Sequence, residues 1–211
     1  IWLSGTSISK TPRRASDSIW WWLPPVIWPE TEGDIQDLVA QALKKGGRNF
    51  VLNAPWQAAL FPHFKDLRVW AGPFCNIANP LAVSTMKSLG FNGVIVSPEM
   101  GRNVILKMAQ ASPMPLGIVL SGLWPLCISR ILSSDIQENQ PFSSPKGEQA
   151  WAVKYGHEYW LFPNWKLYIT RHKERLRKAG YHCFVAMHEP IPRSVRMKAR
   201  EGIWNWVLGL K

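Results

Sequence analysis

The chain has few cysteines and no long apolar run. Its 211 residues include three cysteines, Cys75, Cys127 and Cys183, an odd number spread far apart. This arrangement argues against a disulfide framework and favours a reducing compartment, so we expect a cytoplasmic protein. The longest apolar stretch, residues 19–28, is interrupted by two prolines and is far shorter than the roughly 20 residues that cross a bilayer. We therefore expect no membrane association.

Sequence motifs for common catalytic centres are also missing. The sequence contains no Cys-x-x-Cys, no His-x-x-x-His and no Gly-x-Ser-x-Gly. It therefore predicts no metal site, no cofactor and no serine nucleophile. A chain of this size is long enough for one full domain with a core of its own.

Acidic residues are scarce, especially near the C-terminus. The net charge is +11, and residues 166–211 hold eleven Lys and Arg against three Glu. Such a surface can attract nucleic acid, although a run of charge is usually a solvated helix face. The candidate contacts to nucleic acid lie on a predicted basic helix, residues 167–179: Arg171, Lys173, Arg175, Arg177 and Lys178.

Tryptophan is abundant, with thirteen in the chain. Four of them, Trp160, Trp165, Trp204 and Trp206, are interleaved with the basic segment. Indole rings beside cations suit stacking on unpaired bases, but they equally suit packing of the last helix against a core. We favour packing.

From residue 19 onward, short apolar runs alternate with amphipathic stretches that end at glycine. This rhythm predicts an α/β protein with a parallel sheet, built as an incomplete TIM-type (β/α) barrel of about six strands; an open doubly wound sheet is the alternative. The six predicted strands begin near Ile19, Asn49, Leu67, Gly93, Leu116 and His182. The spacing also predicts helices at residues 35–43, 55–61, 80–89 and 102–111.

Several segments fall outside this rhythm. We expect residues 1–18 to be a linker or the remnant of an upstream unit, and residues 19–190 to be the partial barrel. An insertion at residues 130–165 carries a β-hairpin, and residues 191–211 carry a C-terminal amphipathic helix at 193–208. The two strands that a closed eight-stranded barrel would still need fit a missing N-terminal portion.

Polar residues recur where the predicted strands end. In a βα barrel these ends converge on one mouth, where substrates bind. Glu99 is the candidate catalytic residue, for acid/base or substrate-binding work; capping of the following helix is an equal alternative. The candidate substrate-binding residues are Asn53, Asn76, Asn79, Ser97 and Ser121. For Asn76 and Asn79, satisfying loop backbone groups is the competing interpretation.

Five ordered segments resemble the collagenase-like peptidase family (peptidase U32). Residues 75–79 resemble its Asn-x-x-Asn motif, and residues 94–99 its strand ending in Ser-Pro-Glu. Residues 118–122 occupy the place of a strand ending in His-Gly, residues 144–148 resemble an Asp-Arg-x-Gly turn, and residues 176–181 match a helix ending in Ala-Gly. The resemblance implies a TIM-type barrel and a hydrolase of unassigned mechanism.

Two departures limit what the resemblance implies. Ser121 stands where a histidine is common in the family. Many members hold a [4Fe–4S] cluster through four cysteines, but residues 128–182 contain none, so no cluster is expected. The first hypothesis is a family-type protein that binds a small-molecule or peptide substrate at the barrel mouth. The alternative is a cluster-less subunit that binds RNA or a catalytic partner protein, since some relatives act in RNA hydroxylation.

Overall fold

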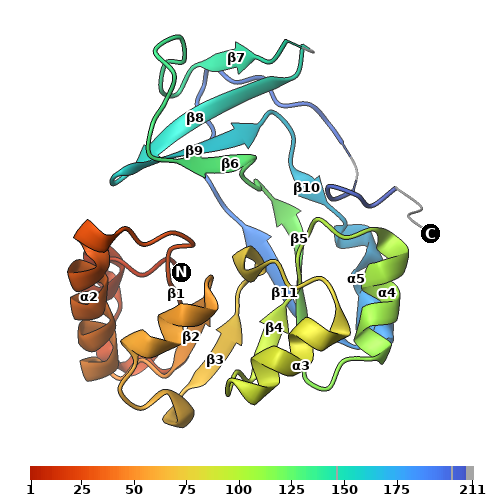
Figure 1. Cartoon of the computed structure of the whole chain (residues 1–211). Coiled ribbons are helices and arrows are strands. Elements are labelled where there is room, and N and C mark those ends of the chain that lie inside the picture. The colour runs from red at the N-terminus through yellow and green to blue at the C-terminus, as the bar shows by residue number, and fades with distance from the viewer. Residues whose placement is uncertain (146, 201, 208–211) are drawn as a thin grey trace.

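The computed structural model describes residues 1–145, 147–200 and 202–207. Its main element is a curled, mostly parallel sheet with helices on its outer face, so the fold is mixed α/β (Figure 1). Six strands of this half-barrel run parallel, in the order β1, β2, β3, β4, β5 and β11. Their bounds are Trp20–Trp22, Asn49–Leu52, Arg68–Ala71, Gly93–Ile95, Leu116–Gly122 and Tyr181–Met187. The predicted number and order of parallel strands are confirmed.

The strands are short. Most of their residues are apolar because helices cover one face of the sheet. β2 and β4 are buried at every position, as expected of central strands in a parallel sheet. The helices that follow the strands are α2 (Glu32–Lys44), α3 (Pro80–Ser88), α4 (Arg102–Gln110) and α5 (Lys173–Ala179). Among the described residues, no helix has the length and apolarity needed to cross a membrane.

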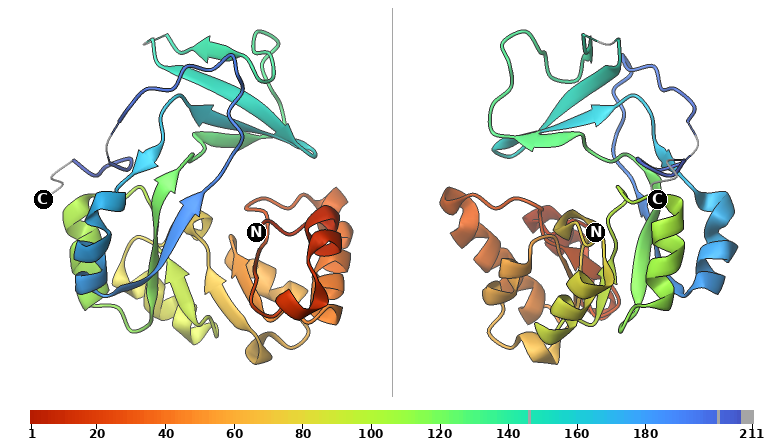
Figure 2. Two further views of the ribbon diagram at one scale, coloured as in Figure 1. Left: turned by 180° about the vertical axis from the view of Figure 1, so that it is seen from behind. Right: turned by 45° about the vertical axis from the view of Figure 1, so that its right-hand side comes forward.

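The concave face of the half-barrel stays open. Alternate strand residues point away from the helices and line a cavity of about 790 Å³, including Trp20, Trp70 and Ile95. Trp20 and Trp70 meet edge to face, with ring centroids 5.9 Å apart. Seen from behind, β11 borders this space on one side and the N-terminal segment on the other (Figure 2). Some of the tryptophans therefore line the concave face of the half-barrel.

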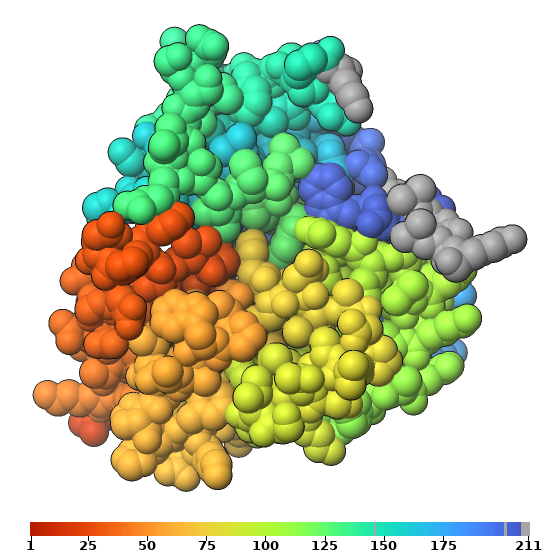
Figure 3. All heavy atoms as spheres, in the orientation of Figure 1, coloured from red at the N-terminus to blue at the C-terminus, as the bar shows by residue number. Residues whose placement is uncertain are grey.

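A second, antiparallel sheet stands over the carboxyl ends of the parallel strands (Figure 1). In the space-filling view, the green to cyan middle part of the chain forms the top of the molecule (Figure 3). The strands of this second sheet, in spatial order, are β6 (Cys127–Ser129), β9 (Glu158–Pro163), β8 (Gln149–Tyr155) and β7 (Pro141–Ser143). The predicted hairpin is thus confirmed as β8 and β9, but it belongs to a four-stranded sheet that β6 ties to the end of β5.

Residues 1–18 are not a linker. They form α1 (Gly5–Lys10), capped by Ser4, and place Leu3 and Ile8 in the core. Trp2 makes a parallel bridge to Trp22 of β1, so this segment extends the sheet edge. The linker interpretation was wrong because the Ser, Thr and Lys of this stretch suggest a loop, whereas Leu3 and Ile8 anchor the segment in the core. The alternative, a remnant of an upstream unit, stays a prediction.

The C-terminal part differs more from expectation. The predicted helix at 167–179 begins instead with β10 (Leu167–Tyr168), antiparallel to the end of β5. A 3-10 turn at Thr170–His172 follows, and the α-helix itself covers residues 173–179. The expected helix at 193–208 is absent from the described residues 193–200 and 202–207, which form turns and bridges; Leu208 lies outside them, as does part of the 191–211 region. Pairing with residues 164–168 explains this, since the amides of Lys198 and Gly202 donate to Asn164 and Tyr168. These cross-strand bonds outweigh helix propensity.

Candidate functional site

The mouth of the half-barrel contains a cavity of about 310 Å³. It lies where the loops after four parallel strands meet the first strand of the upper sheet. The lining residues come from the loops after β1, β3, β4 and β5 and from β6: Pro25, Val26, Pro73, Phe74, Asn76, Glu99, Trp124, Pro125, Leu126, Cys127 and Ile128. We refer to this space as the mouth cavity.

Two of the predicted site residues, Asn76 and Glu99, line the mouth cavity. They are brought together from the loops after β3 and β4. Asn76 ends the 3-10 turn Pro73–Cys75 with φ of 52°, in the left-handed region that asparagine tolerates better than most residues. Both side chains are exposed to solvent. An amide and a carboxylate are therefore available to a ligand.

Glu99 does not cap the helix that follows it. The N-cap of α4 is Gly101, and the first turn of that helix has no acidic residue. The capping interpretation is wrong because α4 begins at Arg102, which leaves Glu99 in the preceding loop. The carboxylate is consequently not engaged by the helix terminus.

Ser97 holds the backbone of Glu99 in place. Its hydroxyl accepts a hydrogen bond from the Glu99 amide at 3.2 Å, and its own amide donates to the carbonyl of Ile77 at 3.0 Å. Ser97 is buried, so it positions the loop and has no access to the cavity. The Asn205 side chain also donates to the carbonyl oxygen of Glu99. The two contacts fix the backbone that carries the carboxylate.

Asn53 is a second buried positioning residue. Its Nδ2 donates to the carbonyl of Leu23 at 2.7 Å, and its amide donates to Oε1 of Gln57 at 2.9 Å. Nε2 of Gln57 in turn donates to the carbonyl of Pro24 at 2.8 Å. This pair ties the loop after β1, which forms one wall of the mouth cavity, to the end of β2.

The structure does not bring Asn79 and Ser121 to the cavity wall. Asn79 is the N-cap of α3, where its Oδ1 accepts from the amide of Ala82 at 2.8 Å. Ser121 lies within β5, paired with Tyr168 on one side and Ala186 on the other. For Asn79 the side chain does satisfy a backbone group, as the competing interpretation held, but that group is an amide in the first turn of α3 and not part of a loop.

An aromatic wall was missed by sequence reasoning. Phe74 and Trp124 stack with ring centroids 4.3 Å apart and an interplanar angle of 23°. Phe74 also meets Trp160 of the upper sheet, at 5.8 Å. Proline next to an aromatic residue just beyond a strand end, at Pro73-Phe74 and Trp124-Pro125, was the available signal.

The electrostatics of the mouth cavity are simple. Glu99 is the one ionisable carboxylate among its lining residues, and the Cys127 thiol is the other titratable group. Desolvation raises the pKa of Cys127, so this sulfur is a thiol and not a thiolate at neutral pH. Within the described part of the chain, no group of three or more His, Cys, Asp or Glu side chains could hold a metal ion. The cavity thus offers one negative charge, one amide and an apolar wall.

The predicted nucleic-acid residues lie away from the mouth, around α5. Lys173 and Arg177 lie over the ring of Phe184 on β11, 5.4 and 5.9 Å from its centre. Arg177 also pairs with Glu174 at 2.9 Å. Arg175 and Lys178 are exposed on the same helix, and Arg171 lies in the turn before it.

The aromatic residues interleaved with these cations pack against the protein. Trp160 and Trp206 are buried, and Trp204 meets Trp165 edge to face at 4.8 Å. Packing of these rings, the interpretation favoured from the sequence, describes them better than base stacking does.

Comparison with known proteins adds no family to this description. No protein-family model matches the chain, no curated protein matches it, and no solved structure matches it.

Proposed function

We propose that the mouth cavity binds the amino-terminal end or another cationic group of a peptide substrate, with Glu99 as the residue that contacts the charge. The observation that carries the proposal is the meeting of Asn76 and Glu99 in one aromatic-walled cavity. A carboxylate attracts an ammonium group, and the Phe74–Trp124 stack offers apolar surface to an adjacent side chain. Asn76 can donate to and accept from a peptide bond.

The finer fold assignment belongs to the same proposal. We infer a TIM-type barrel of the collagenase-like peptidase kind, supported by the six ordered parallel strands and by a cavity at their carboxyl ends. Three free thiols favour a reducing compartment such as the cytoplasm. In a hydrolytic reaction, Glu99 would take the proton from a water molecule that attacks the peptide carbonyl and pass it to the leaving amine.

Binding is tested with the tripeptide Ala-Phe-Ala, with a free or an acetylated amino terminus, by titration calorimetry. We expect the free peptide to bind and acetylation to weaken binding at least tenfold, because the acetyl group removes the charge. Glu99→Gln keeps the shape of the side chain and should abolish the preference. Glu138→Gln, an exposed carboxylate outside the cavity, is the matched control.

The same samples separate binding from catalysis. Mass spectrometry after prolonged incubation detects cleavage, which Glu99→Gln should remove if the carboxylate is the base. Equal binding of free and acetylated peptide, or an unchanged preference in Glu99→Gln, would overturn the proposal.

A further inference from the structure

A second groove lies beside β10, on a different part of the molecule from the mouth cavity. It has a volume of about 580 Å³. One wall comes from the chain around β10 and the other from the C-terminal segment that crosses it. The lining residues are Lys166, Tyr168, Arg171, Met197, Lys198, Ala199 and Arg200. We call this the basic groove.

The charged residues that line the basic groove, as far as the structure describes it, are all cationic. Four of its seven described lining residues are Lys or Arg, and none is acidic. Lys166 and Lys198 come from opposite walls of the groove. A parallel β-bridge between Trp165 and Lys198 holds the two walls side by side. Cations fixed on both sides of a groove suit a ligand with repeated negative charges.

Side chains along β10 alternate between buried and exposed, and this places the ring of Tyr168 beside these cations. Leu167 and Ile169 are buried, so Lys166 and Tyr168 point outward from the same face. The Tyr168 side chain is 49% exposed. Its backbone is held on both sides, by β5 and by Gly202. A tyrosine ring on a fixed strand, open to solvent and flanked by cations, is a stacking platform.

Arg200 is also held in place. Its guanidinium lies 3.9 Å from the centre of the Trp165 ring. A planar cation that already stacks on an indole loses little freedom when a phosphate binds. The groove is thus partly organised before any ligand arrives.

We propose that the basic groove binds single-stranded nucleic acid, with Lys166, Lys198 and Arg200 on phosphates and Tyr168 stacked on a base. A single strand is favoured over a duplex because only an unpaired base can present its face to Tyr168. This site is independent of the mouth cavity. Of the residues that the sequence pointed to, Arg171 lines this groove. Lys173 and Arg177 instead lie over Phe184 on β11, and Arg177 pairs with Glu174.

The test uses the full chain and a fluorescein-labelled oligouridine twelve-mer, with binding followed by anisotropy across a salt series. Wild-type affinity should fall as salt rises. Lys166→Ala and Lys198→Ala should each lower the slope of log K against log salt by about 0.7, the value for one phosphate contact on a single strand. Arg175→Ala and Lys178→Ala on α5 are charge-matched controls and should change affinity less.

Tyr168 separates nucleic-acid binding from general attraction to polyanions. Tyr168→Ala should weaken oligouridine binding about tenfold, whereas Tyr168→Phe keeps the ring and should bind like the wild type. The affinity for heparin, which has no bases, should be the same for Tyr168→Ala as for the wild type. All these side chains are exposed, so thermal melts of the variants should match the wild type.

Three outcomes would overturn the proposal. The first is no binding by the wild type at low salt. The second is equal loss in the α5 controls, and the third is a Tyr168→Ala variant that binds oligouridine unchanged. Glu99→Gln should leave oligouridine binding intact, so a failure here is distinct from a failure at the mouth.

Discussion

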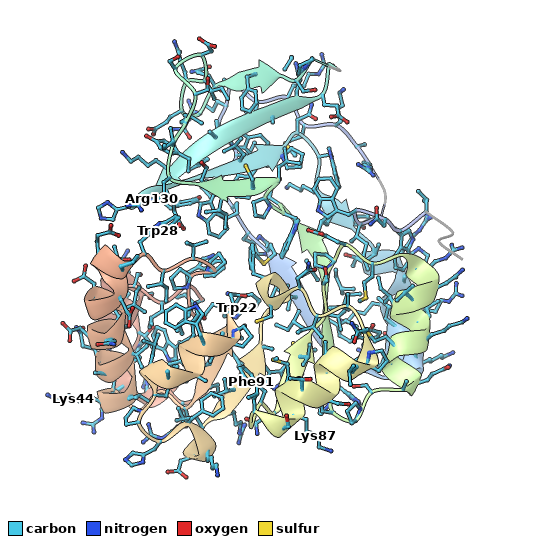
Figure 4. All side chains as sticks on the ribbon, in the orientation of Figure 1. Trp22, Trp28, Lys44, Lys87, Phe91 and Arg130 are labelled. Carbon is cyan, nitrogen blue, oxygen red and sulfur yellow. The ribbon has the colours of Figure 1, made fainter. Side chains whose placement is uncertain are left out.

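The indole of Trp160 donates a hydrogen bond of 2.8 Å to the carboxylate of Glu158, inside the contact between the upper sheet and the half-barrel. Glu158 is 7% exposed. Desolvation raises the pKa of this carboxyl above its ordinary value, and the hydrogen bond from the indole of Trp160 offsets part of that rise. Nearby, Arg130 lies over Trp28, 4.6 Å from its ring centre, and pairs with Glu30 (Figure 4).

Glu158 should therefore make stability depend on pH. The folded state holds its proton more tightly than the unfolded chain, so its contribution to stability is fully present below the ordinary carboxyl pKa. That contribution is lost as pH rises through the raised folded pKa. We expect Glu158→Gln, which keeps an acceptor for Trp160, to raise the melting temperature more at pH 8 than at pH 4.

The control for this prediction is the exposed Glu138→Gln, which should not change the pH dependence of melting. A Glu158→Gln variant that melts below the wild type at pH 8 would show that the charged form is the stabilising one.

Close packing at Gly72 gives a second prediction. A Cβ atom at this position would lie 2.0 Å from Oδ1 of Asn53 and 2.9 Å from a methyl group of Val51. Gly72→Ala should lower the free energy of unfolding by roughly 1–3 kcal/mol, since both neighbours are buried. It should also disturb the loop that carries Phe74 and Asn76. Denaturant unfolding measures the first effect and peptide affinity the second.

Gly33 is the matched control for this substitution. It lies near the start of α2 with nothing within 4 Å of its added Cβ. Gly33→Ala should raise the free energy of unfolding by about 0.5–1 kcal/mol, because alanine is the better helix former. Equal effects at both positions would contradict the packing argument.

The half-barrel could be read from the sequence because each of its signals is local. Buried parallel strands are continuous apolar runs, and glycines such as Gly180 in the left-handed region end the helices between them. Strand positions near Asn49, Leu67 and Gly93 were correct to within a residue or two. The same logic brought Asn76 and Glu99 to one edge.

The failures share a physical cause, which is long-range pairing. The amphipathic pattern of residues 193–208 favours a helix, but the backbone of Lys198 pairs with a segment more than thirty residues earlier in the chain. The aromatic wall formed by Phe74 and Trp124 joins two loops that only the curl of the sheet brings together. Neither relationship has a periodic signature, so the alternation that predicted the parallel strands could not reveal either of them.

Tyr181 gives a third prediction, for the contact between α4 and β11. Its buried hydroxyl donates to the carbonyl of Ile105 at 2.8 Å. Tyr181→Phe should lower the free energy of unfolding by about 1 kcal/mol, because the ring packing stays and one buried hydrogen bond is lost. Tyr168→Phe removes an exposed hydroxyl and should cost less than half as much. A neutral Tyr181→Phe would mean that the bond adds nothing to stability.

The three free cysteines should differ in reactivity, and one of them reports on the mouth cavity. Burial raises the pKa of Cys75 to about 12, and Cys183 is half-buried, whereas Cys127 is exposed. Thiolate fraction and access control alkylation, so iodoacetamide at pH 8 should modify Cys127 first and Cys75 last. Peptide mass spectrometry gives the order, and all three should react alike in denaturant.

Because Cys127 lines the mouth cavity, saturating Ala-Phe-Ala should slow its alkylation and leave that of Cys183 unchanged. Equal protection of both thiols would indicate that the peptide acts elsewhere.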